Sequence, residues 1–103
     1  MAVRIVWSPA ARADLIDIYM TIGGENIRAA DRYYDWIEER AMQLAYQPRM
    51  GVRRPDIRPS TRMLVAAPFV LLYETNPDTD EGAVDWVEVV RVVDGRRDLN
   101  RLF

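Results

Sequence analysis

Residues 8–44 read SPAARADLIDIYMTIGGENIRAADRYYDWIEERAMQL, a pattern that predicts two helices with a short break between them. Ser8 and Pro9 form a helix start, with a hydroxyl at the N-cap and proline at the first helical position. Gly23 and Gly24 end this helix, and Asn26 caps the next one. Because the break is so short, we expect the two helices to form an antiparallel hairpin.

Apolar residues recur at helical spacing in both segments, which predicts the faces that pack in the core. These faces are Ala11, Leu15, Ile18 and Ile22 in the first helix, and Ala30, Tyr33, Tyr34, Ile37, Ala41 and Leu44 in the second. The first helix also carries a second apolar stripe, Ala13, Ile16 and Met20. The stripe is either covered by the sheet and the second helix, or left free for a partner helix. Trp36 is either a boundary residue or an exposed anchor.

Strand-forming residues flank the hairpin on both sides. They predict strands at residues 4–7, 62–66, 69–74 and 86–93, with an extended loop over residues 48–60. The order is β-α-α-β-β-β, an α+β fold in which a helical hairpin packs on a mainly antiparallel sheet within one domain, residues 1–103. Strict alternation in the last strand places Trp86, Glu88, Val90 and Val92 on one face and Val87, Val89, Arg91 and Val93 on the other.

The sequence contains neither cysteine nor histidine. Thiolate chemistry and sulfur-ligated zinc are therefore excluded, and the commonest general acid–base and metal ligand is missing. We expect no metal site and no cofactor. The longest apolar run, residues 63–73, is about half the length of a membrane span and is interrupted by Pro68. We expect a cytoplasmic protein that does not bind a membrane.

Charge is unevenly distributed in the second half of the chain. Residues 49–73 hold five arginines against one aspartate, whereas residues 74–90 hold six carboxylates and no base. Arginine suits bidentate contacts with carboxylates, so Arg53, Arg54 and Arg58 are predicted to meet an acidic partner segment. The pI near 5.1 argues against tight binding to ribosomal RNA, and we expect no sequence-specific nucleic-acid binding by this chain alone.

Five segments, in the same order along the chain, resemble those of the ParE branch of the RelE/ParE toxin superfamily: residues 7–15, 29–32, 44–51, 62–73 and 87–99. The last of these is similar to the family's final strand and its H-G-x-R-D ending, with Asp94 where histidine is frequent. The resemblance implies the toxin of a type II toxin–antitoxin (plasmid stabilisation) system, neutralised by a ParD-like antitoxin and inhibiting DNA gyrase without being an enzyme.

Two other functions remain open. One is a ribosome-dependent messenger endoribonuclease of the RelE kind, which needs a general acid and a general base. Tyr73 and Glu88 are the candidates for these groups, but each is more simply read as a strand residue, so no catalytic residue is assigned. The other is a non-toxic protein-binding adaptor.

Two surfaces are predicted for the toxin. The target surface comprises Arg91, Arg96, Arg97, Arg101 and Phe103. Arg91 could instead pair with a carboxylate of its own chain, and Arg96 and Arg97 could instead belong to a solvated turn. The antitoxin surface comprises Ile16, Met20, Trp36, Arg53, Arg54 and Arg58. The apolar residues near the end, Leu99, Leu102 and Phe103, either only dock on the core or also present the neighbouring arginines to the target.

Overall fold

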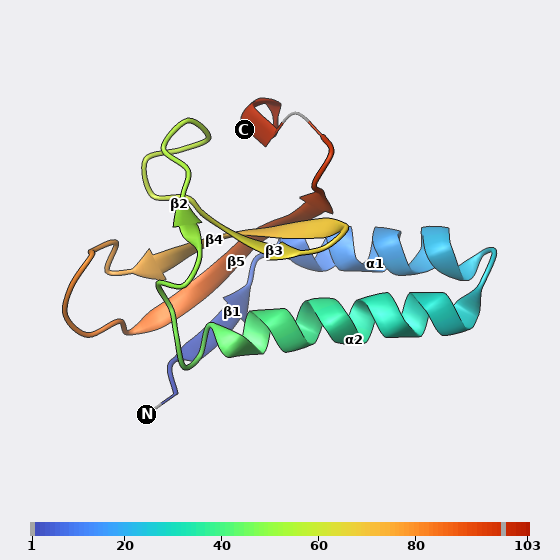
Figure 1. Cartoon of the computed structure of the whole chain (residues 1–103), viewed down its shortest axis with the longest axis horizontal. Coiled ribbons are helices and arrows are strands. Elements are labelled where there is room, and N and C mark those ends of the chain that lie inside the picture. The colour runs from blue at the N-terminus through green and yellow to red at the C-terminus, as the bar shows by residue number, and fades with distance from the viewer. Residues whose placement is uncertain (1, 98) are drawn as a thin grey trace.

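Two antiparallel helices cover one face of a five-stranded sheet in the computed structural model, which describes residues 2–97 and 99–103 (Figure 1). The elements follow the predicted order with one additional strand. They are β1 (Arg4–Trp7), α1 (Pro9–Gly23), α2 (Ile27–Gln43), β2 (Val52–Arg53), β3 (Arg62–Ala66), β4 (Phe69–Asn76), β5 (Trp86–Asp94) and a final 3₁₀ turn, η1 (Leu99–Arg101).

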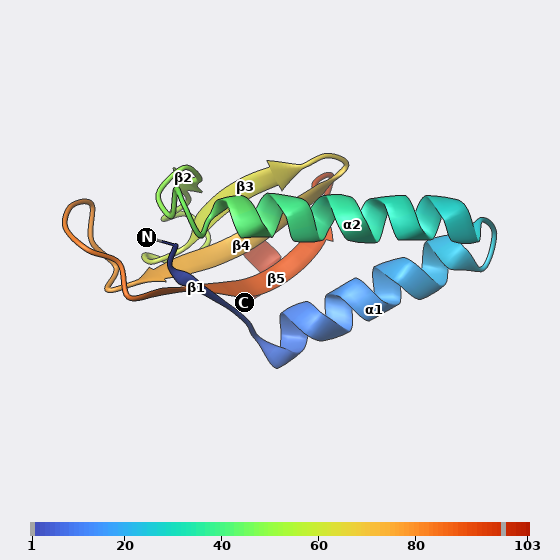
Figure 2. The same ribbon diagram turned by 90° about the horizontal axis from the view of Figure 1, so that it is seen from below.

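Side-chain caps start both helices as predicted. The Ser8 hydroxyl oxygen accepts a hydrogen bond from the Ala11 N–H at 3.0 Å, and the Asn26 side chain accepts one from the Ala29 N–H at 3.0 Å. The Ser8 hydroxyl also donates to the Val90 carbonyl at 2.7 Å, which ties the start of α1 to β5. Figure 2 shows that the hairpin extends past the sheet at its turn. Among the described residues, no helix is long and apolar enough to cross a membrane.

The sheet has the strand order β1-β5-β4-β3-β2. Of the strand pairs among the described residues, only β1–β5 is parallel, so the prediction of a mainly antiparallel sheet is confirmed. The loop expected over residues 48–60 is not wholly irregular, because Val52 and Arg53 pair with Met63 and Arg62 as the edge strand β2. The sequence pattern did not predict this strand, because the strand is short, contains an arginine and lies between a glycine and a proline.

A β-bulge in β5 changes which residues face the helices. Leu72 pairs with Arg91 while the next residue, Tyr73, pairs with Val89, so Val90 is the extra residue. A bulge shifts the alternation of side chains by one position. Val92 therefore joins the main core with Val87 and Val89, whereas Val93 lies on the opposite face. The prediction that Val92 shares a face with Trp86 and Val93 one with Val87 was wrong.

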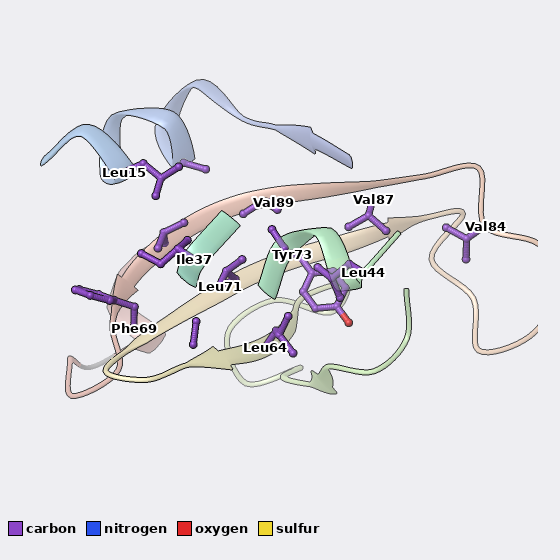
Figure 3. Packing of buried hydrophobic residues seen from close by; sticks show 14 residues of the cluster. Leu15, Ile37, Leu44, Leu64, Phe69, Leu71, Tyr73, Val84, Val87 and Val89 are labelled. Atoms are coloured by element: carbon purple, nitrogen blue, oxygen red, sulfur yellow. The ribbon is translucent and has the colours of Figure 1, made fainter. Parts of the chain in front are cut away.

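The main core lies between the hairpin and the sheet (Figure 3). Ile37 of α2, Leu44 at the C-cap of α2 and Tyr73 of β4 are fully buried in it. Complete burial of an aliphatic side chain of this size stabilises a fold by about 1.5–3 kcal/mol. A second, smaller core lies on the other face of the sheet and contains Val70, Val93, Leu99, Ile57, Met63 and Leu102.

Candidate functional site

The second apolar stripe of α1 is open on the surface of the hairpin. Ile16 is 60% exposed and Met20 is 68% exposed, so neither the sheet nor α2 covers them. They line a shallow groove together with Tyr19, Asp31 and Tyr34. Of the two readings of this stripe, the structure supports the one in which it is free for a partner.

Aromatic side chains shape the floor of this groove. The rings of Tyr19 and Tyr34 meet edge to face with their centroids 6.0 Å apart. The Tyr19 hydroxyl donates to an Asp31 carboxylate oxygen at 2.8 Å, and this hydrogen bond raises the pKa of Tyr19. These contacts connect the two aromatic rings of the groove to each other and connect α1 to α2.

Trp36 is a partly exposed residue on α2, with 38% of its surface accessible. The Arg40 guanidinium lies over its ring, 5.7 Å from the centroid, and the Arg40 Nε donates to the Val65 carbonyl at 2.9 Å. Trp36 thus stands at the boundary between α2 and β3, beside a cation of its own helix.

The predicted arginine surface is largely engaged with the chain's own carboxylates. Arg53 pairs with Asp78 at 3.0 Å and with Asp80 at 2.9 Å. Arg54 pairs with Asp56 at 2.8 Å. These ion pairs occupy guanidinium groups that were predicted to bind a partner. The loop therefore carries less free positive charge than its composition suggests.

Two further arginines hold the acidic loop that follows β4. Arg49 donates to the carbonyls of Thr79 and Gly82 at 2.8 and 2.9 Å. Arg62, which is 5% exposed, donates to Asp80 at 3.1 Å. The hydrogen bond from Arg53 is the main reason that the pKa of Asp80 is lowered. Arginines of the basic segment therefore pair with two carboxylates, Asp78 and Asp80, of the acidic segment that follows it.

Arg91 lies at the edge of the sheet and pairs with a carboxylate of α1. Its Nε and Nη2 donate to the two oxygens of Asp14 at 2.7 and 3.0 Å, and the Val92 N–H donates to the same side chain at 2.9 Å. The hydrogen bond with Asp14 raises the pKa of Arg91. Of the two alternatives for Arg91, the geometry favours the structural one.

A groove of about 530 Å³ lies between α1, the end of β5 and the β3–β4 corner. Arg96 and Arg97 are on its rim, and Arg96 holds Asp94 through a 2.6 Å ion pair. Its apolar lining is Ile18, Ile22, Tyr33, Phe69, Val92 and Val93. Sequence reasoning missed this groove because its lining residues belong to the predicted core stripes.

The residues predicted for the target surface do not form one patch. Arg96 and Arg97 share the groove, whereas Arg91 is bound to Asp14. The Arg58 guanidinium carbon lies over the Phe103 ring, 4.3 Å from the ring centroid. Arg101 is exposed in η1.

Of the two candidate acid–base residues, Tyr73 is poorly placed for chemistry. Tyr73 is fully buried, and its hydroxyl oxygen accepts a hydrogen bond from the Gly51 N–H at 2.8 Å. Burial raises the pKa of Tyr73, so its proton is harder to remove. Glu88 is partly buried on the other face of the sheet and stands opposite Glu74 in the β4–β5 register.

Comparison with known proteins agrees with this fold. The family model described as "ParE toxin of type II toxin-antitoxin system, parDE" matches residues 5–99, and the chain belongs to this family. Among its relatives is Toxin ParE1 of Mycobacterium tuberculosis, 34% identical over 102 residues that cover 98% of each chain. Toxin ParE3 of Caulobacter vibrioides is 27% identical over 97 residues, covering 93% of this chain and 90% of the relative.

The fold also matches a solved structure described as "Chromosomal ParDE TA system from P. aeruginosa". The TM-score is 0.72 at 22% sequence identity, with 90% of this chain and 96% of that chain covered. The predicted fold class and the predicted family are both confirmed.

Proposed function

We propose that this toxin acts by binding a protein target, DNA gyrase, and that a ParD-like antitoxin neutralises it by covering the toxin surface. The pair would act as a plasmid-stabilisation, or addiction, system in the cytoplasm. In this proposal the toxin is not an enzyme and works as a stoichiometric inhibitor.

The open apolar stripe of α1 is the observation that carries the antitoxin-binding part of the proposal. Ile16 and Met20 are more than half exposed beside the rigid Tyr19–Tyr34 pair. A groove of this kind on a helical hairpin suits the apolar face of an amphipathic helix, which would bury these side chains. The antitoxin surface proposed here is centred on Ile16 and Met20, with Trp36 at its margin.

The arginine loop is the second part of the proposed antitoxin surface. Arg53 and Arg54 already hold carboxylates of their own chain, so an acidic antitoxin segment would have to compete with Asp78, Asp80 and Asp56. Partly exposed ion pairs contribute little, and exchange of one carboxylate for another is cheap. We therefore expect the loop to add salt-dependent attraction rather than most of the affinity.

The target surface proposed here is the groove at the end of β5 with Arg96 and Arg97 on its rim. Arg101 and Phe103, in the C-terminal segment that docks on the second core, form a separate second part of it. The apolar floor and basic rim of the groove suit a protein segment that carries both apolar and acidic side chains. Arg91 contributes to this surface by fixing α1 against β5 through Asp14.

The burial of Tyr73 supports a binding mechanism over ribonuclease activity. A ribonuclease needs a proton donor and acceptor within hydrogen-bond reach of the substrate. Tyr73 is fully buried, and arginine is too basic to serve as an ordinary proton shuttle.

A supercoiling assay with purified gyrase tests the proposal. The purified toxin should inhibit supercoiling of relaxed plasmid, and addition of the antitoxin encoded beside the gene should restore it at a stoichiometric ratio. Full supercoiling at toxin in large excess over gyrase would contradict the gyrase proposal. Growth arrest by the toxin alone, relieved by the antitoxin, separates a toxin from a harmless adaptor.

A further inference from the structure

The loop after β2 is a folded unit with its own hydrogen bonds. The Arg54 N–H donates to the Thr61 carbonyl at 2.8 Å and closes the loop, while the N–H groups of Ile57 and Arg58 donate to the Arg54 carbonyl at 2.9 and 3.3 Å. The Arg54–Asp56 ion pair adds a further internal constraint. We call residues 54–61 the platform loop, because its backbone is ordered by contacts within the loop itself.

The platform loop and the C-terminal segment lie on the same side of the sheet (Figure 1). Ile57 of the loop and Leu102 of the segment pack against the second core, in which Leu99 is 8% exposed over Val70 and Val93. The segment therefore docks on the face away from the helices, and one wall of its docking site is the loop.

One contact at the surface joins the two parts. The Arg58 guanidinium carbon lies 4.3 Å from the centroid of the Phe103 ring, well within the range of a cation–π interaction. Phe103 is 46% exposed, so apolar burial alone does not fix its ring. Arg58 is itself exposed, and its backbone N–H is bonded within the loop, so its cation is presented from an ordered base.

We propose that Arg58 is a positioning residue for the C-terminal segment. By holding the Phe103 ring, it keeps residues 99–103 docked on the second core and thereby orients Arg101 of η1 and the arginines that precede η1, Arg96 and Arg97. The consequence for toxicity rests on the proposed function, because it assumes that Arg96, Arg97 and Arg101 meet the target. The docking itself does not depend on that assumption. Arg58 would then act through Phe103 and not as a contact for the antitoxin.

The structural part of the proposal is tested by NMR relaxation on Arg58→Met, Phe103→Leu and the double variant. Arg58→Met keeps the apolar stem and removes the charge, and Phe103→Leu keeps apolar bulk and removes the ring. Each single variant should raise the undocked population about two- to fivefold, the range for an exposed cation–π contact. The order parameter of the Leu102 amide should fall below the rigid value of about 0.85 in each single variant.

The double variant distinguishes a direct contact from two separate effects. If Arg58 acts through Phe103, the double variant should be no more mobile than either single variant, because one interaction can be lost only once. Arg58→Lys should retain part of the order, since an ammonium is also attracted to a ring face. Arg32→Met, which changes an exposed arginine of α2, is the matched control and should leave Leu102 unchanged. Unchanged order in both single variants, or additive loosening in the double variant, would overturn the proposal.

Functional readouts on the same proteins separate this proposal from the one above. Arg58→Met should inhibit gyrase less well while binding the antitoxin with unchanged affinity. Lower antitoxin affinity with unchanged order at Leu102 would make Arg58 an antitoxin contact and overturn the positioning role. If the wild-type toxin leaves gyrase unaffected, the proposed function fails, and the relaxation measurements still decide whether Arg58 positions the segment.

Discussion

The N–H of Gly51 donates a hydrogen bond to the Tyr73 hydroxyl oxygen at 2.8 Å, and this contact joins the segment just before β2 to the centre of the sheet. A Cβ atom at residue 51 would lie 2.5 Å from a Tyr73 ring carbon and 2.8 Å from the Met63 carbonyl oxygen. Only glycine lets the chain pass this close. The glycine that ends the family-like segment 44–51 thus has a steric cause, and Tyr73 is occupied as a structural residue.

Gly51→Ala should lower the free energy of unfolding by about 1–3 kcal/mol, because the added methyl group overlaps both the ring and the backbone. Tyr73→Phe should cost about 1–3 kcal/mol by leaving the buried Gly51 N–H without its acceptor. Urea unfolding measures both changes. Gly24→Ala is the control: its Cβ would meet the nearest atom at 3.5 Å, so its stability should be unchanged or higher. Equal stability of the Gly51 and Gly24 variants would contradict the steric argument.

Removing the Asp14 carboxylate should destabilise the junction of α1 and β5. Asp14→Ala leaves the Arg91 guanidinium and the Val92 N–H unpaired at a partly buried site, and we expect a loss of about 1–3 kcal/mol. Asp17→Ala, three residues further along α1 and exposed, should change the unfolding free energy by less than about 0.5 kcal/mol. If the two variants unfold at the same urea concentration, Arg91 is not held by Asp14 in solution.

Replacing the open stripe of α1 should affect binding and spare folding. Ile16→Gln and Met20→Gln change side chains that are 60% and 68% exposed, so their melting temperatures should remain close to that of the wild type. Antitoxin affinity, measured by calorimetry, should fall about tenfold or more for the double variant, since a hot-spot residue contributes about 2 kcal/mol or more. Val65→Gln, at an exposed position on β3, is the control and should bind normally.

The pH dependence of Asp94 reports on the rim of the proposed target groove. Hydrogen bonds from the Arg96 side chain and backbone lower the pKa of Asp94 from 3.8 to about 2. A carboxyl whose pKa is lowered by folding stabilises the fold at pH values above 3.8, and this contribution is lost as the pH falls toward 2.

Arg96→Gln should move the titration midpoint of the Asp94 carboxyl upward toward 3.8, as followed by carbon-13 NMR. Arg97→Gln should move it less, because Arg97 acts on Asp94 only through its charge at a distance. A midpoint that is the same in the wild type and in Arg96→Gln would show that the Asp94–Arg96 pair does not form in solution. Asp94 stands where histidine is frequent in the family, and its pairing with Arg96 gives this aspartate a local structural role.

Features with local causes were predictable from the sequence. Ser8 and Asn26 cap the helices through contacts within three residues, and periodicity identified the buried faces that contain Leu15 and Ile37. The bulge at Val90 was not predictable, because nothing in a run of valines marks where one extra residue enters the ladder. The wrong facing of Val92 and Val93 follows from that single residue.

The candidate site was predicted less well because its contacts join segments distant in the sequence. The exposure of Ile16 depends on how α2 crosses α1, which helical periodicity does not specify. The pairing of Arg53 with Asp78 and Asp80 depends on the acidic loop folding back over β2. One signal was present in the sequence: a block of arginines followed directly by a block of carboxylates, which are able to pair with each other as well as with a partner.

We propose that the toxin arrests growth by binding gyrase and not by cutting messenger RNA. Inducible expression in bacteria, with plasmid supercoiling and messenger integrity followed in the same culture, tests it most directly. We expect loss of supercoiling, or induction of the DNA-damage response, while messengers remain intact. Co-expression of the antitoxin should reverse whichever of these effects is seen. Rapid messenger cleavage with normal supercoiling would contradict it.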